Sequence, residues 1–148
     1  MKQGGILHPE ILDLIAAAGH GDVIVLTDAG LKVPDGAYRI DLALTCGVPS
    51  IVDVVRAFKE ELVIEDAIVA DEFSEWNPEV YAATLAELPV EPSAKPHREL
   101  MEEMAASAYA YVKTGECSAY ASVALVCGVN YLEEAIDLYT ELHGEPPA

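Results

Sequence analysis

A histidine and an aspartate flank the first apolar run of the chain, and both residue types can move protons or hold hydroxyl groups. His20 stands between two glycines in the segment AAAGHGD, so its neighbours in sequence leave its ring uncovered. An imidazole titrates close to neutral pH, which suits general acid–base chemistry. Asp28 follows the run VIVLT, and Gly30 lets the backbone approach a ligand closely. Each residue also has a structural interpretation, because a histidine at a helix end interacts with the helix dipole and an aspartate can form a turn.

Other polar side chains near apolar runs carry weaker signals. Asp71 and Glu72 end the run AIVADE, where the pattern favours a structural or solvated role over ligand contact. His97 opens a helical segment after a proline-rich stretch, which favours a cap-region residue over a site residue. Asp41 falls inside a strand-like run and needs a partner if it is buried. Because no phosphate loop, dinucleotide fingerprint, HExxH or GxSxG motif is present, the pattern predicts only an acidic protein with a histidine and one or two aspartates at a pocket.

These residues depend on helices and buried strands that alternate along the chain. Amphipathic spacing predicts helices within residues 8–19, 49–62, 77–88, 97–108 and 130–142. Short apolar runs predict buried strands within residues 22–28, 38–45, 63–71, 109–116 and 120–129. The proline-rich segment 89–96 is predicted to be an extended surface connection, and Gly19 a helix C-cap. Ligands in open α/β sheets bind beyond the carboxyl ends of the strands, which places Asp28 at a predicted pocket.

The order of these elements predicts the fold class and the domain organisation. We expect an α/β fold, in which a single layered domain has a central, mostly parallel sheet flanked by helices. An extra C-terminal helix is expected over residues 131–142. Residues 1–130 are accordingly expected to form this layered domain, and residues 131–148 a helical extension and tail.

Composition restricts the classes of partner. The chain has 148 residues, 26 of them acidic and 8 basic, and a formal net charge of -18. Nucleic acid and acidic membrane surfaces are recognised by clusters of Lys and Arg, so neither is an expected partner, whereas a neutral ligand such as a sugar is compatible. No apolar run approaches the roughly 18–20 residues of a membrane span. The N-terminal residues lack the pattern of a signal peptide, and we therefore expect a cytoplasmic protein.

The three cysteines are Cys46, Cys117 and Cys127. No two of them are spaced as CxxC, so a zinc site is not predicted. An odd number of cysteines in a chain expected to be cytoplasmic favours buried free thiols. No cofactor and no metal are expected.

Several motifs together resemble the RbsD/FucU family, and its D-ribose pyranase branch in particular. They are GGILHPEI, GHGD, DAGLKVPDG, RIDLALTCGVPS, NPE, the histidine of KPHREL, and TGECSAYASVALVCGV. They follow one another in family order from about residue 4 to residue 129, so the resemblance covers nearly the whole chain except the terminal helix. The combination of GHGD, DAG and RIDLALTCGVPS is much more specific than any one of these motifs.

The resemblance implies a fold, an assembly and a reaction. It implies an α/β protein that forms a ring-like homo-oligomer with active sites at subunit boundaries. It implies a cofactor-independent isomerase that interconverts the β-pyranose and β-furanose forms of D-ribose. The family's catalytic histidine falls on His20, and its substrate-binding positions fall on Asp28, His97, Tyr120, Ala121 and Ser122. We expect His20 to give a proton to the ring oxygen, with Asp28 in the same pocket holding the sugar or orienting the imidazole.

The chain departs from the family pattern at two places. Ser122 stands where the family has asparagine, and one hydroxyl replaces an amide donor and a carbonyl acceptor. The helix expected over 131–142 lies beyond the usual end of the family. These departures leave two alternatives open, a mutarotase for fucose or another sugar and a non-catalytic monosaccharide-binding or regulatory protein.

Overall fold

The computed structural model describes residues 1–148 and contains one six-stranded sheet in the order β2-β5-β1-β6-β3-β4. The strands are β1 Val23–Thr27, β2 Arg39–Asp41, β3 Ile64–Ala70, β4 Ser93–Lys95, β5 Ala110–Lys113 and β6 Val123–Cys127. The pairs β1–β5, β2–β5 and β3–β4 are parallel, whereas β6 runs antiparallel to both of its neighbours, β1 and β3. Every strand except β6 therefore points the same way, which confirms the predicted mostly parallel sheet.

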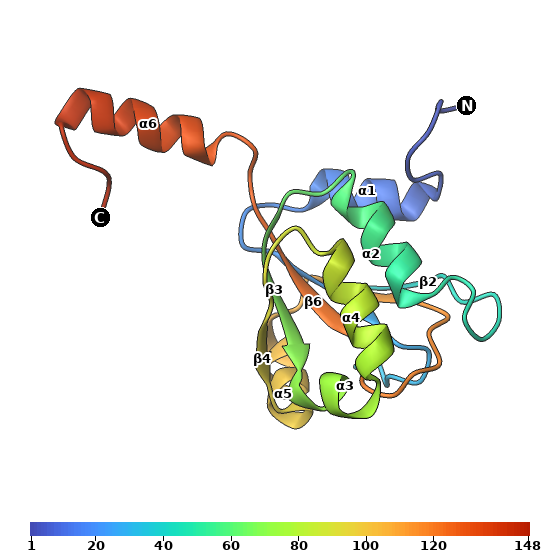
Figure 1. Cartoon of the computed structure of the whole chain (residues 1–148). Helices are drawn as coiled ribbons and strands as arrows, with labels where there is room; N and C mark the ends of the chain where they lie inside the picture. The colour runs from blue at the N-terminus through green and yellow to red at the C-terminus, as the bar shows by residue number, and fades with distance from the viewer.

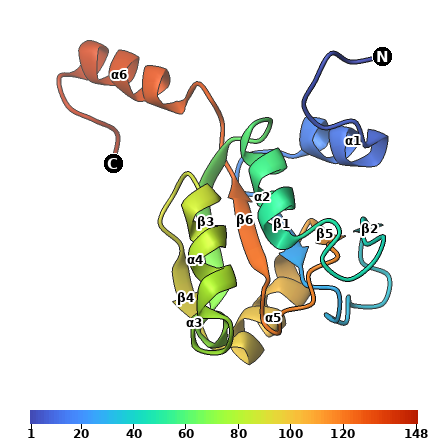
Figure 2. The same ribbon diagram turned by 45° about the vertical axis from the view of Figure 1, so that its right-hand side comes forward.

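Helices cover both faces of this sheet. They are α1 Pro9–Ala17, α2 Ile51–Lys59, α3 Asp71–Trp76, α4 Pro78–Glu87, α5 His97–Ser107 and α6 Leu132–His143. Helices α2 and α4 lie on one face and α5 on the other (Figures 1 and 2). Ile24 and Leu26 of β1 belong to the larger core cluster with α1 and α2, whereas Val25 belongs to the smaller cluster with α5. This alternation is expected of a strand that is buried on both faces.

Local sequence signals explain several of the helix ends. Ser50 caps α2, because its hydroxyl accepts from the Asp53 N–H while the Asp53 side chain accepts from the Ser50 N–H. Pro9 occupies the first position of α1, where an N–H would have no partner. That helix ends with Ala18 as its C-cap, one residue before the predicted Gly19.

The structure differs from the predicted elements at four places. The second strand is shorter than expected and covers only Arg39–Asp41. Segment 89–96 contains the edge strand β4, which pairs with β3. The predicted end of the third strand is the start of α3, with Asp71 as its first residue. The last two predicted strands, which the sequence places around a glycine-containing turn, are β5 and β6, but β1 separates them in the sheet.

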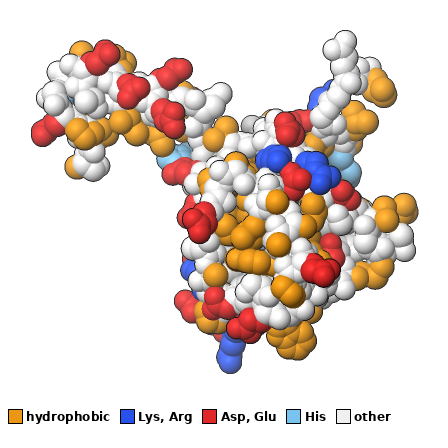
Figure 3. Space-filling view, in the orientation of Figure 1, with side chains coloured by type: hydrophobic (Ala, Val, Ile, Leu, Met, Phe, Trp, Pro, Cys, Tyr) orange, Lys and Arg blue, Asp and Glu red, His pale blue; other side chains and the backbone are white.

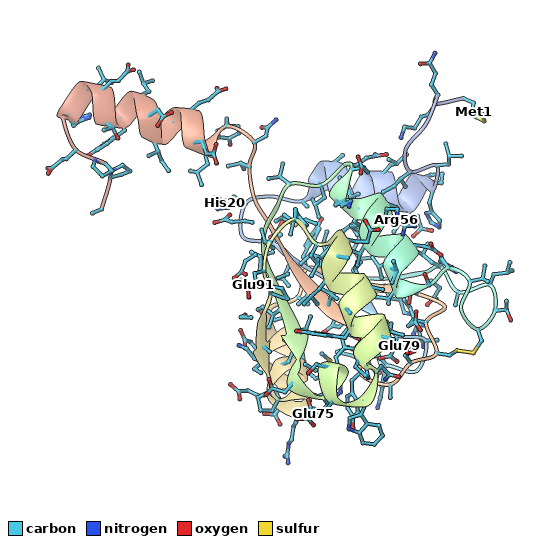
Figure 4. The ribbon with its side chains drawn as sticks, viewed as in Figure 1. Met1, His20, Arg56, Glu75, Glu79 and Glu91 are labelled. Atoms are coloured by element: carbon cyan, nitrogen blue, oxygen red, sulfur yellow. A yellow bond between two sulfur atoms is a disulfide. The ribbon has the colours of Figure 1, made fainter.

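The cysteines pair where the sequence favoured free thiols. Cys46 and Cys117 form a disulfide across 71 residues of sequence, and only Cys127 is free and buried (Figure 4). The loop after β5 packs directly on the loop before α2, since a Cβ at Gly115 would lie 2.6 Å from the Val48 carbonyl oxygen. This close approach brings the two cysteines together, and sequence spacing carries no sign of it.

Helix α6 is present as predicted, but it packs on nothing. It extends away from the body of the molecule (Figures 1 and 2), and none of its residues is buried. Acidic and hydrophobic side chains both lie on its surface (Figure 3). No helix of the chain combines the length and the apolar character that crossing a membrane requires.

Candidate functional site

A hollow of about 610 Å³ lies at the carboxyl end of β1, where a ligand is expected in an open α/β sheet. Its walls are segment 28–32 after β1, segment 116–120 after β5, and His97 at the start of α5. The hollow thus brings together three of the predicted site residues, Asp28, His97 and Tyr120.

Asp28 is held at both carboxylate oxygens. The Gly30 N–H donates to Oδ1 at 2.9 Å, and the Ser122 hydroxyl donates to Oδ2 at 3.1 Å. The Asp28 N–H in turn donates to Ser122 Oγ at 3.1 Å. The two interpretations of Asp28 are therefore compatible, because it forms a turn with Gly30 and also lines the hollow.

His97 and Tyr120 form an aromatic wall. Their ring centroids are 5.0 Å apart and the rings meet edge to face. The His97 N–H donates to Glu72 Oε2 at 2.8 Å, so Glu72 holds the start of α5 and has the predicted structural role. His97 Nδ1 is buried without a hydrogen-bond partner. Buried polar atoms are nearly always paired, so this unpaired nitrogen in a residue that lines the hollow is an exception.

Tyr120 also has an unusual backbone. Its φ is 63°, the only positive value at a residue other than glycine. Residues in this region cost free energy and cluster at ligand sites. Trp76 of α3 also meets Tyr120 edge to face, with ring centroids 5.3 Å apart, although Trp76 is 64% exposed. The ring of Tyr120 thus contacts two aromatic neighbours.

Sequence reasoning missed three side chains near the hollow: Glu116, Lys32 and Trp76. Glu116 is buried, and its carboxylate accepts from the Ile51 N–H at 3.1 Å and from the Ser118 hydroxyl at 2.8 Å. Its position beyond β5 matches that of Asp28 beyond β1, so the same strand-end argument could have found it. Lys32 is a lining cation with no acidic partner; it stands inside the motif DAGLKVPDG, but sequence reasoning assigned no chemistry to it.

His20 lies at the opposite end of the sheet from the hollow. It precedes β1 and Asp28 follows it, so the full strand of about 16 Å separates them at roughly 3.3 Å per residue. Figure 4 shows His20 at the end from which α6 extends, while Glu75 of α3 marks the other end. Within one chain His20 and Asp28 therefore do not share a pocket, because an extended strand carries its two ends to opposite edges of the sheet. That the two residues meet in one pocket stays a prediction, which requires a second copy of the chain.

A carboxylate accompanies His20 at its own end of the sheet. Its Nε2 lies 2.6 Å from Glu65 Oε2, and the two side chains are 48% and 44% exposed. The His20 ring is thus oriented by Glu65 while it remains accessible from outside the chain. The adjoining backbone is fixed to the end of β6 by the Gly21 N–H, which donates to the Cys127 carbonyl at 2.8 Å.

The last two predicted site residues do not line the hollow. Ala121 and Ser122 are 0% and 1% exposed and lie behind its wall. The Ala121 N–H donates to the Ser118 carbonyl, and the Ser122 hydroxyl is bonded to Asp28. No group of three or more His, Cys, Asp or Glu side chains is arranged to hold a metal ion.

Comparison with known proteins fits this geometry. The model of the RbsD / FucU transport protein family matches residues 1–130. The chain belongs to the RbsD/FucU family. It is 44% identical over 137 residues to the D-ribose pyranase of Vibrio vulnificus strain YJ016, a match that covers 87% of this chain and 99% of that one. It is 40% identical over 131 residues to the D-ribose pyranase of Geobacillus thermodenitrificans, covering 88% and 99%.

Solved structures of the RbsD/FucU family share the fold. Bacillus subtilis RbsD complexed with D-ribose superposes with a TM-score of 0.81 at 36% identity, covering 87% of this chain and 98% of that one. The fucose mutarotase of Streptococcus pneumoniae in complex with L-fucose has a TM-score of 0.72 at 22% identity, covering 83% and 94%, and shows the fold alone. Helix α6 lies beyond the residues that the family model matches.

Proposed function

We propose that this RbsD/FucU-family protein is a D-ribose pyranase that interconverts the β-pyranose and β-furanose forms of the sugar. One observation carries the proposal. Asp28, His97 and Tyr120 line one open hollow, with a buried His97 nitrogen left unpaired, in a chain that is 44% identical to a D-ribose pyranase.

The reaction is general acid–base chemistry. The anomeric hydroxyl loses a proton while the ring oxygen gains one, which opens the hemiacetal to the aldehyde. The aldehyde then closes again through a different hydroxyl and gives the furanose. Asp28 and Tyr120 hold sugar hydroxyls in this scheme, and His97 Nδ1 pairs with another. A positioned proton donor contributes typically about 10²–10⁴-fold to such a step.

The proton donor to the ring oxygen is His20 of a neighbouring copy. Within one chain His20 and Asp28 lie at opposite ends of β1, and His20 is half-exposed, so a second copy can reach it. A contact between the His20 end of one copy and the hollow of the next is head-to-tail. Contacts of this kind form rings when the rotation closes. The proposal is therefore a ring-like homo-oligomer with its sites at subunit boundaries.

The same proposal covers the domain organisation and the compartment. Residues 1–130 form the catalytic domain and residues 131–148 an extension, because the family match ends at residue 130 and no residue of α6 is buried. The cytoplasm is the proposed compartment, as a protein that acts on an internalised monosaccharide requires. The Cys46–Cys117 bond is the one feature that favours an oxidising environment.

Exchange NMR on D-ribose tests the proposal. The unmodified protein should speed pyranose–furanose exchange, and Asp28→Ala and His20→Ala should each remove the acceleration. Ser107→Ala, which deletes an exposed hydroxyl on α5, is the matched control and should retain full activity. Binding of D-ribose without acceleration would instead support the non-catalytic sugar-binding alternative. Acceleration with L-fucose but not with D-ribose would support the other mutarotase.

A further inference from the structure

Ser122 is a buried hydroxyl in the first position before β6, and it is 1% exposed. A buried hydroxyl is expected to be hydrogen-bonded, so its partners show what it does. Its backbone N–H donates to the carbonyl of Tyr120 at 2.9 Å, which ties it to the wall of the hollow. Its side chain is not part of that wall.

Both side-chain hydrogen bonds of Ser122 end on the same residue. A serine hydroxyl has one proton to donate and two lone pairs that accept. The proton goes to Asp28 Oδ2, and one lone pair accepts from the Asp28 N–H, each at 3.1 Å. The hydroxyl therefore has no proton left for a sugar, and burial keeps its remaining lone pair from the hollow.

This pair of bonds fixes the Asp28 carboxylate from a distant part of the chain. The bond from Gly30 to Oδ1 is local to the turn, whereas Ser122 is 94 residues away in sequence. The two residues meet because β6 starts beside the end of β1, with Val123 paired to Leu26. A carboxylate that is held at both oxygens before the ligand arrives loses less conformational freedom on binding.

We propose that Ser122 is a positioning residue, which acts on the sugar through Asp28 and does not bind the sugar itself. The proposal rests on the proposed function of the hollow. The hydroxyl at residue 122 sets the rotamer of Asp28, and the sugar meets only the carboxylate. The residue is thus a determinant of affinity that is hidden behind the surface of the pocket.

A double-mutant cycle tests whether the effect passes through Asp28. Ser122→Ala should weaken D-ribose binding about tenfold in the unmodified protein, since a hydrogen bond to a charged group is lost. In an Asp28→Asn background the same change should weaken binding less than about twofold. Saturation-transfer NMR measures even millimolar complexes, so both backgrounds are accessible. An equal loss in the two backgrounds, or no loss in either, would overturn the proposal.

Two further variants separate positioning from general damage to the fold. Ser122→Thr keeps the hydroxyl and should retain most of the affinity, whereas Ser107→Ala is an identical change at a remote exposed site and should have no effect. A Ser122→Thr protein that folds but binds as weakly as Ser122→Ala would count against the proposal.

The Asp28 amide gives a readout that needs no sugar. Its N–H donates to Ser122 Oγ, so Ser122→Ala should speed hydrogen exchange at Asp28 more than at the other amides of the hollow. Unchanged protection of this amide would overturn the positioning role even if the protein is an active pyranase. Faster exchange at Asp28 in a protein that neither binds nor converts D-ribose would locate the failure in the proposed function instead.

Discussion

The two ends of β1 differ in how completely one chain builds them. At the carboxyl end, Asp28 is bonded to Gly30 and Ser122, and the adjoining wall is fastened by the Cys46–Cys117 disulfide. At the other end, His20 has Glu65 as its side-chain partner, and both are about half-exposed.

This difference shows which part of the site is preorganised. Bonds from distant segments fix Asp28 and the adjoining wall of the hollow before any ligand arrives, and preorganisation of this kind lowers the cost of binding. The His20 end presents its imidazole outward, where a second copy can reach it. In the proposed assembly each hollow receives the reactive group of a neighbour, and catalysis depends on the oligomer.

Mixing two inactive variants tests most directly whether the two ends of β1 act in sites that two chains build together. His20→Ala should slow exchange by about 100-fold or more, within the usual range for a positioned acid–base group. Asp28→Ala should slow it by a similar factor, because the sugar is no longer held in the hollow. After the two are unfolded together and reassembled at equal ratio, about one quarter of the sites should combine an intact His20 with an intact Asp28. Exchange NMR measures the recovery. A mixture no more active than its components would show that one chain supplies both residues.

Removing the disulfide should affect the two ends unequally. Cys46→Ser should lower the free energy of unfolding by about 2–4 kcal/mol, as the loss of a bond that closes a long loop does. Native-state hydrogen exchange should rise in segment 115–120 and remain unchanged at residues 19–22. Chemical denaturation gives the stability, and added reductant should not alter the variant further. An equal rise in hydrogen exchange in both segments would show that the disulfide does not stabilise the carboxyl end of β1 selectively.

Glu65 tests the His20 end on its own. Glu65→Gln should slow sugar exchange about tenfold, because a carboxylate on one ring nitrogen fixes which nitrogen carries the proton. The free energy of unfolding should change by less than about 1 kcal/mol, since the pair is largely solvated. Glu102→Gln, which breaks a more exposed ion pair on α5, is the matched control and should leave activity intact. Undiminished activity in Glu65→Gln would show that His20 acts without this partner.

The buried thiol of Cys127, next to the His20 end of the sheet, should make the stability of the protein depend on pH. Burial raises the pKa of the Cys127 thiol to about 11, from an ordinary value of 9.0. The unfolded chain loses this proton first, so stability should fall as the pH rises from about 9 towards 11. Denaturation of Cys127→Ala should lack this part of the pH dependence. At pH 8 a thiol reagent should label no cysteine of the native protein. It should label two after reduction of the folded protein, and all three when the reduced protein is also unfolded.

Removing α6 should have the smallest effect. A chain ending at residue 130 should lose less than about 1 kcal/mol of stability, because none of the helix is buried. Its assembly should keep the same number of copies, which light scattering after size-exclusion chromatography reports. Dissociation of the shortened protein would show that α6 is part of the interface between copies.

Local patterns predicted the parts of the fold that local energetics control. The helix predicted within residues 49–62 is α2, and the run VIVLT is the buried strand β1. The edge strand β4 was missed because its three residues stand between prolines and bury little. Helix α3 was missed because Asp71 was assigned to the end of a strand, and a helix of 6 residues has little periodicity.

The sequence by itself determined the alternation of helices and strands, the motifs that place the chain in its family, and the position of Asp28 at the end of β1. Only the tertiary structure decided that His20 and Asp28 lie apart, that Cys46 meets Cys117, and that Ser122 holds Asp28. Helix and strand periodicity and helix capping depend on residues that are close in sequence, so the sequence predicts them. Contacts across 71 or 94 residues depend on strand order and register, which the packing of the whole sheet sets.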